Sequence, residues 1–230
     1  MRQNKTWFFR NNDVFKGLKT TELAFLDANS QVEKFRRKAV IWETGDPSTH
    51  VYWIRMGILK MHRSALDDRE HIQGFFTKGD LVGENALYSE KKREQTAVVC
   101  EDMTALSLER EAFLELGLRN PNILCKVGTV LAERAAFQAR WHAFLMYRTV
   151  PARLAGLFLR LAKTFGIRDS RGIILNLKLT HREMASIIGA TRETVSFAIL
   201  GKKKQGLIEI QGKRVIVIEM EGVQRLLSGS

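Results

Sequence analysis

The pattern of apolar and polar positions changes period twice along the chain. Residues 6–30 place apolar side chains at helical spacing, which predicts a short helical segment. From about residue 32 to residue 109, short runs rich in β-branched and aromatic residues alternate with Gly, Asp and Pro. After residue 120 the helical period returns. The pattern therefore predicts a β-rich part between two helical parts.

The β-rich part contains five runs that we expect to be strands. They are residues 38–43, 50–64, 71–77, 95–102 and 103–109. Turn signals such as "TGDPS" and "TKGDLVGE" separate them. Short strands at regular spacing with such turns favour an all-β sandwich or barrel.

A long helix is predicted over residues 120–148, with Pro121 in its first turn. One apolar stripe follows spacings of 4, 3, 7, 4 and 3, and Arg134 fills its gap at a seam position. Spacing of this kind predicts a coiled-coil seam between two copies of the chain, and the alternative is a helix packed within a monomer. The candidate dimer residues are Ile123, Val127, Val130, Phe137, Trp141 and Phe144.

The C-terminal part reads as a helix-turn-helix followed by a hairpin. A helix starts near Thr149 and Pro151, and "IILNLKL" is a plausible strand. Thr180 and Glu183 fit a capping box, and a glycine separates the two short helices "HREMASII" and "RETVSFAIL". The runs "LIEIQ" and "RVIVIE" then predict a β-hairpin wing.

The charge of the chain is concentrated at this end. The 230 residues carry a formal charge of +12, and residues 149–230 hold 14 Lys and Arg against six Asp and Glu. Such an excess favours a polyanion partner, either nucleic acid or an anionic membrane surface, over a solvated basic face. No apolar run approaches 18 residues, so we expect a cytoplasmic protein without membrane contact.

DNA is the polyanion that a helix-turn-helix suits, because residues at the N-terminal end of its second helix reach base edges in the major groove. Arg can pair with guanine and Glu can accept from cytosine, while hydroxyls, amides and lysines meet phosphates. The candidate DNA-binding residues are Thr180, His181, Thr191, Arg192, Glu193, Thr194, Ser196, Phe197, Lys203 and Lys213.

The whole chain resembles the CRP/FNR family of bacterial transcription regulators. The segments that carry the resemblance are "TGDPS", "GDLVGENALY", "NPNIL" and "LTHREMASIIGATRETVSFAIL". The resemblance implies an α+β architecture with a β jelly-roll effector domain over residues 1–119. A dimerisation helix over 120–148 and a winged helix-turn-helix over 149–230 would complete it. It also implies a homodimer on palindromic double-stranded DNA, with RNA polymerase as a partner.

This chain differs from the family's cyclic-AMP pocket at the ligand contacts, which predicts an effector other than cyclic AMP. Gly83 and Glu84 match the pattern, but Gln95 stands where the family has the arginine that meets the cyclic phosphate. Arg93 is close, and we expect it to point elsewhere. In the long helix, Gln138 and Ala139 replace the family's adenine contacts. The candidate effector-pocket residues are Gly83, Glu84, Asn85, Ala86, Gln95, Thr96, Gln138 and Trp141.

Other branches of the family leave the effector open. The iron–sulfur sensors need an N-terminal cysteine cluster, which this chain lacks, so no Fe–S cluster is expected. Haem-based sensing of CO or NO stays possible through one of the four histidines His50, His62, His71 and His142. An apolar effector beside the helix aromatics is another possibility, as is a module that acts through protein contacts. We see no nucleophile–base pair, zinc spacing or P-loop, so no catalytic or metal-binding residue is predicted.

The predicted recognition helix also departs from the family. Phe197 stands five residues after Arg192, where many members have a second arginine. We therefore expect a half-site related to TGTGA but altered at one or two positions. Gly201 and Lys202 replace helix-continuing and buried apolar residues, so the helix is expected to end early or bend at Gly201.

Overall fold

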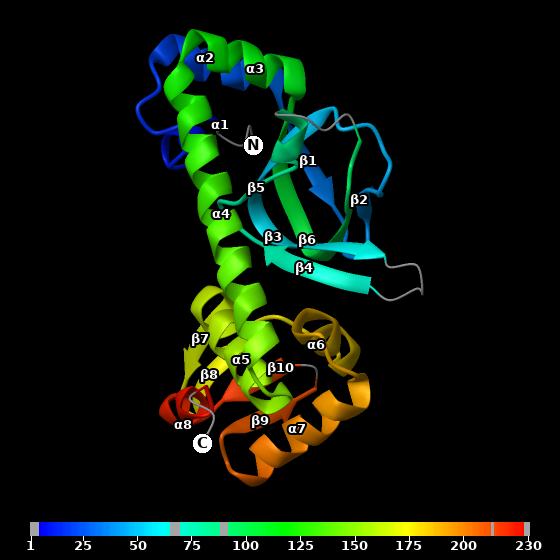
Figure 1. The fold of residues 1–230 in the computed structure, drawn as a ribbon. Coiled ribbons are helices and arrows are strands. Elements are labelled where there is room, and N and C mark those ends of the chain that lie inside the picture. The colour runs from blue at the N-terminus through cyan, green and yellow to red at the C-terminus, as the bar shows by residue number, and fades with distance from the viewer. Residues whose placement is uncertain (1–4, 65–69, 88–91, 213, 228–230) are drawn as a thin grey trace. The chain divides into compact units, whose positions relative to one another are not determined.

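A computed structural model describes residues 5–64, 70–87, 92–212 and 214–227 (Figure 1). The chain divides into two compact units, Met1–Ala135 and Ala136–Ser230. The long helix α4 (Pro121–Tyr147) is continuous across this division. Each unit has its own sheet and its own helices, and they are described in turn.

The first unit contains one antiparallel sheet with the strand order β1-β6-β3-β4, in which β2 also pairs with β6 and β5 with β3. Long strands β3 and β6 form its centre. The strands are β1 (Ser30–Phe35), β2 (Val40–Trp42), β3 (His50–Ser64), β4 (Glu70–Phe76), β5 (Leu81–Val82) and β6 (Thr96–Glu109). The predicted mixed architecture with a β-rich N-terminal domain is confirmed.

Two details of the strand prediction were wrong. Residues 95–102 and 103–109 were expected to be separate strands, but they form the single strand β6. Strand β1 was not predicted, because its sequence "SQVEKF" is mostly polar and only half buried. A strand paired along one edge to β6 needs no continuous apolar run, so its pattern is weak.

Helices cover one face of this sheet. They are α1 (Lys5–Arg10), α2 (Thr20–Asn29), the 3₁₀ helix η1 (Glu84–Leu87), α3 (Arg110–Arg119) and the beginning of α4. Helices α2 and α3 lie side by side (Figure 1). Trp53 packs between Phe15 and Phe113, with ring centroids 4.6 and 5.6 Å away. This aromatic core fixes the helices on the sheet.

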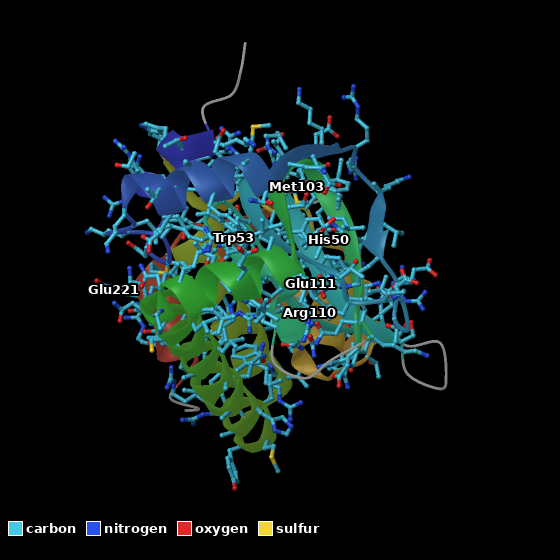
Figure 2. All side chains as sticks on the ribbon, turned by 90° about the horizontal axis from the view of Figure 1, so that it is seen from above. His50, Trp53, Met103, Arg110, Glu111 and Glu221 are labelled. Atoms are coloured by element: carbon cyan, nitrogen blue, oxygen red, sulfur yellow. The ribbon has the colours of Figure 1, made fainter. Side chains whose placement is uncertain are left out.

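A second apolar core fills the other side of the sheet. It contains Trp42, Ile54, Leu59 and Met103, all at most 6% exposed. Figure 2 marks Trp53 from the first core and Met103 from the second. Gly57 has φ +96°, and an added Cβ would lie 2.6 Å from the carbonyl oxygen of Asp102. The glycine therefore lets β3 bend closely against β6.

The second unit consists of the last turns of α4, a three-helix core and a small sheet. The sheet has the order β7-β8-β10-β9 and is antiparallel throughout. Its elements are α5 (Val150–Phe165), β7 (Gly166–Asp169), β8 (Gly172–Leu175), α6 (His181–Ile188), α7 (Arg192–Lys204), β9 (Ile208–Gln211), β10 (Arg214–Val217) and α8 (Met220–Arg225). The predicted helix-turn-helix and hairpin wing are confirmed. None of the described helices is long and apolar enough to cross a membrane.

Candidate functional site

Local capping sets where the two short helices begin and end. The Thr180 hydroxyl accepts a hydrogen bond from the Glu183 amide at 3.1 Å, and the Glu183 carboxylate accepts one from the Thr180 amide at 2.9 Å. Gly189 ends α6 in the left-handed region at φ +62°. Thr191 then caps α7 by accepting from the Thr194 amide at 3.2 Å. The capping box predicted from the sequence is therefore present.

Helix α7 has one buried and one exposed face. Val195 and Ile199 are at most 3% exposed and hold the helix against the unit's core. Arg192 and Glu193 lie on the exposed side, and Phe197 is 75% exposed. In the part of the chain that the structure describes, the Arg192 and Glu193 side chains make no hydrogen bond or ion pair. The helix thus presents two unpaired charges and one bare aromatic ring at its N-terminal half.

Several other predicted DNA-binding residues bond to one another. His181 Nδ1 lies 2.8 Å from Ser196 Oγ, and that hydroxyl donates to the Arg192 carbonyl at 2.9 Å. The Thr191 and Thr194 hydroxyls are 2.8 Å apart. These bonds link α6 to α7 and tie up part of the hydrogen-bonding capacity of the side chains. They also hold the first turn of α7 in place, which sequence spacing alone does not show.

The C-terminal half of α7 differs from the prediction. The helix continues through Gly201 to Lys204, so the expected early end was wrong. The Leu207 amide donates a hydrogen bond to the Lys202 carbonyl, which gives one carbonyl of the last turn of α7 a partner. Lys202 continues the buried face of Val195 and Ile199 and is only 3% exposed. Burial lowers the pKa of Lys202 to about 8.

Further charged residues lie in the small sheet and at the end of this helix. Arg171, in the turn between β7 and β8, reaches Asp169 of β7 at 2.9 Å and Glu209 of β9 at 3.6 Å. The hydrogen bond from the Arg171 guanidinium, with one from Ser170, holds the pKa of Asp169 at about 2. Lys203 is exposed at the end of α7. Lys213, the predicted phosphate contact of the wing, lies outside the described residues.

The acidic residue of the predicted effector site, Glu84, begins η1 in the first unit. Glu84 is 8% exposed, and its carboxylate accepts a hydrogen bond from Arg134 of α4 at 2.6 Å. Arg134 also lies 3.7 Å from Asp80. Burial raises the pKa of Asp80, whereas the Thr77 amide and Arg134 lower it. The acidic group expected to meet an effector is therefore already paired with an arginine of its own chain.

The sequence led us to expect that Arg93 points away from this site, but it does not. Its guanidinium donates to the carbonyls of Gly83 at 3.2 Å and His50 at 2.5 Å, and it lies 4.2 Å from the ring of Trp42. Arg93 lies before the strand predicted at residues 95–102 and before β6, which begins at Thr96. A bend before the strand frees its side chain to turn inward.

The remaining predicted pocket residues are divided between the two units and differ in exposure. Gln95 is half exposed, and Thr96 accepts from the Thr44 amide at 3.2 Å. Asn85 is exposed, and Ala86 is 1% exposed within the core between sheet and helices, so Ala86 does not line an open pocket. Gln138 and Trp141 belong to the second unit, where Gln138 is exposed and Trp141 half buried.

The predicted dimer residues of α4 differ in how far their own chain covers them. Ile123 and Val127 are at most 1% exposed inside the first unit's core, and Val130 packs against that core. Phe144 and Trp141 stack on each other beside α5. Ile123 and Val127 are covered by their own chain, whereas Val130, Trp141 and Phe144 are only partly covered. Phe137, 40% exposed, is the member of the set that stays accessible.

A different stripe of α4 is exposed. Its members step by 4, 3, 4, 3, 4 and 3 residues, which is also a heptad pattern. They are Cys125, Thr129, Ala132, Ala136, Ala139, Ala143 and Met146. Sequence reasoning passed over this stripe because its side chains are small. It also missed the pairing of Arg134 with Glu84, although a lone arginine in an apolar heptad was a signal of a specific partner.

Family models match both parts of the chain. A cyclic nucleotide-binding domain matches residues 32–120, and a Crp-like helix-turn-helix domain matches residues 152–226. The first match includes Glu84 and Arg93. The second covers α5 to α8, including the exposed face of α7.

Relatives match over almost the whole length. The CRP-like cAMP-activated global transcriptional regulator of Mycobacterium tuberculosis is 29% identical over 212 residues, covering 92% of this chain and 95% of the relative. A CRP-family transcriptional regulator from Thermus thermophilus matches in structure with a TM-score of 0.75 and 25% identity, covering 86% of this chain and 97% of that one.

A c-di-GMP responsive global regulator from Xanthomonas campestris matches in fold, with a TM-score of 0.77 and 22% identity, over 87% of this chain and all of the other. These relatives are regulators of transcription, and two of them are described as responding to different nucleotides. Both domains, their order and their relatives agree: the chain belongs to the CRP/FNR family of transcription regulators.

Proposed function

We propose that the protein is a homodimer that binds palindromic DNA and regulates transcription under the control of a small effector other than cAMP. The observation that carries this proposal is the N-terminal half of α7. Its two charged side chains are exposed and unpaired among the described residues, on a helix whose start is fixed by caps. A helix of this kind is built to receive its partner from outside the chain.

The exposed residues define an expected reading pattern. Arg192 suits a guanine, and Glu193 suits the amino group of a cytosine. Phe197 is too exposed to serve the core, and its ring suits a thymine methyl group. The half-site is therefore expected to resemble TGTGA with a change where Phe197 replaces an arginine. Lys203 adds affinity through phosphates, and RNA polymerase is the partner expected at the promoter.

Selection from a random DNA library tests the DNA-binding proposal. The full chain is expected to enrich a palindrome with one conserved G·C-containing block in each half. Enrichment of unrelated sequences, or of none, would instead support a module that acts only through protein contacts. The selection is run with and without cell extract, so that a missing effector does not hide the activity.

Homodimerisation is proposed through the exposed stripe of α4. Small side chains let two helices approach closely, and the heptad step keeps the stripe facing its partner. Ala139→Glu puts a charge into the middle of the stripe and is expected to give a monomer in sedimentation velocity. Ala24→Glu, which places the same charge on an exposed position of α2, is the matched control and should remain dimeric. A monomeric wild type, or a dimeric Ala139→Glu variant, would contradict the assignment.

The effector proposal follows from how the first unit uses its charges. Both terminal nitrogens of Arg93 bond to backbone carbonyls, and Glu84 is bonded to Arg134. Arg93 Nε is buried without a hydrogen-bond partner, so a cyclic phosphate would meet one unused donor but would compete with two carbonyls at the terminal nitrogens. Gln138 and Ala139 offer no adenine contact of the type that the family's cAMP sensors use. An effector that bonds Glu84 would share its carboxylate with Arg134, which makes the pair a control point in this proposal.

Calorimetric titration with cAMP tests this directly. No saturable heat is expected up to roughly millimolar cAMP, which corresponds to binding weaker than about 4 kcal/mol. Saturable binding would contradict the proposal. An absorption spectrum and native mass spectrometry of the purified dimer complete the test, since a Soret band would replace the proposed effector class with haem.

A further inference from the structure

The last three turns of α4 are joined to α5 by a compact aromatic cluster within the second unit. Trp141 and Phe144 stack with centroids 5.3 Å apart and planes 22° apart. Arg160 of α5 places its guanidinium 4.7 Å from the Trp141 ring and 5.3 Å from the Phe137 ring. We call Phe137, Trp141, Phe144 and Arg160 the clamp.

Gly156 makes this close approach possible. A Cβ added there would lie 2.7 Å from two ring atoms of Phe144 and 3.6 Å from Trp141. Glycine in the interior of α5 weakens the helix relative to alanine. Its presence opposite the stacked rings is explained by the contact between α4 and α5, since any side chain would push the helices apart.

The charge of Arg160 is compensated by rings and not by a carboxylate. Burial lowers the pKa of Arg160. Its Nη1 is buried without a hydrogen-bond partner, and no ion pair of Arg160 exists within the described ranges. The faces of Trp141 and Phe137 therefore supply its favourable electrostatic contact. The Arg160 guanidinium loses its contacts with these two rings if α5 moves away from α4.

A second arginine joins the same helix to the helix-turn-helix. Arg153 Nε donates to the Arg148 carbonyl just after α4 at 2.8 Å. Its Nη1 donates to the carbonyls of Ile188 and Gly189, at the end of α6, at 3.3 and 3.2 Å. Gly189 precedes the Thr191 cap of α7 by two residues. The end of α4 is thus tied to the base of the reading helix as well as to α5.

We propose that Arg160 and Arg153 are positioning residues for DNA binding, and that the clamp makes residues 137–147 of α4 part of the DNA-binding unit. The direction of the reading helix is then set by α4 itself and not by the turn at Arg148 and Thr149. This rests on the proposed homodimer, in which α4 of each chain would determine the distance between the two reading helices. One base pair of spacing moves a half-site by about 3.4 Å, so a firm clamp makes the dimer selective for spacing.

Arg160→Leu tests the clamp, with Lys163→Leu on the exposed side of α5 as the matched loss of charge. Affinity is measured for the selected palindrome, for versions with one or two base pairs inserted or removed, and for an isolated half-site. Arg160→Leu is expected to reduce the ratio of optimal to shifted-spacing affinity at least about tenfold, because a loosened helix tolerates more spacings. Half-site affinity should change less than twofold. Lys163→Leu should weaken all fragments alike through its lost charge.

Rescue and local exchange separate positioning from mere stability. Arg160→Lys keeps a cation over the rings and should restore most of the spacing ratio. In the full-length protein, amide exchange over residues 137–147 should be faster in Arg160→Leu than in Arg160→Lys or the wild type. An unchanged spacing ratio, or unchanged exchange, would overturn the clamp. A wild type without sequence-selective binding would overturn the proposed function instead, so the two failures are distinguishable.

Discussion

The reading helix and the effector region treat their charges in opposite ways. On α7, Arg192 and Glu193 are exposed and have no partner among the described residues. In the first unit, Glu84 is held by Arg134, and Arg93 is held by two backbone carbonyls. The charges on the exposed face of α7 are therefore unbonded among the described residues, whereas Glu84 and Arg93 in the first unit are already bonded within the chain. The two regions therefore differ in how far their charged side chains are already bonded within the chain.

Gly83→Ala tests how tightly the effector region is closed and should have the largest effect. An added Cβ would lie 2.6 Å from Arg93 Nη1, and the backbone there has φ +79°. Backbone strain and steric overlap together are expected to cost about 4 kcal/mol of unfolding free energy. Urea unfolding measures this. A loss below about 1 kcal/mol would show that Arg93 gives way easily and that the region is open.

Lys202→Met tests the exception within the second unit, a charge buried in α7. The pKa of Lys202 falls from 10.5 to about 8 on folding, so the unfolded chain binds the extra proton between these two pH values. Stability therefore rises with pH across this window, and the full penalty applies below it. Methionine should stabilise the protein by on the order of 3 kcal/mol at about pH 7.

The pH dependence provides the control for that variant. The stability difference between Lys202→Met and the wild type should shrink as pH rises from 8 toward 10.5. Urea unfolding at several pH values follows it. A difference that stays constant with pH would mean that methionine stabilises the protein through packing. Burying the charged Lys202 side chain would then cost no free energy.

A double-mutant cycle tests the pairing of Glu84 with Arg134. Each single change to glutamine leaves the other group in a largely buried place, with side chains 10% and 26% exposed. The interaction energy in unfolding measurements is expected to be about 1–2 kcal/mol. If the two changes are additive, the pair contributes nothing to the closed state, and the effector region is as ready for a partner as α7.

Gly201→Ala has the smallest expected effect and, like Lys202→Met, is expected to stabilise the protein. No atom lies within 4 Å of a Cβ added at Gly201, and α7 is helical on both sides of it. Alanine should stabilise the helix by about 0.5–1 kcal/mol, measured by thermal unfolding. Destabilisation would mean that the backbone of α7 at this point favours glycine, as a bend at Gly201 would.

The sequence predicted the second unit better than the first for a physical reason. The caps at Thr180 and Thr191 and the turn at Gly189 act over three or four residues, so local spacing shows them. Arg93 precedes β6, and its direction follows from contacts with Gly83, His50 and Trp42. These contacts come from other segments of the chain, so local spacing does not show them.

The dimer seam shows the same limit in a helix. Heptad spacing places Ile123 and Val127 on one face of α4 but does not tell whose core covers that face. The first unit's helices and sheet cover it. The stripe through Ala136 and Ala139 became visible only when exposure was known, because alanine carries little apolar signal.

The central claim is that α7 reads DNA through Arg192 and Glu193, and a comparison of two variants on selected DNA tests it most directly. Arg192→Ala should lose about 1–3 kcal/mol of specific binding and relax one base position. Lys203→Ala should weaken binding to all sequences equally and reduce the salt dependence. The contradicting result is the reverse: an altered base preference in Lys203→Ala, with unchanged preference and affinity in Arg192→Ala.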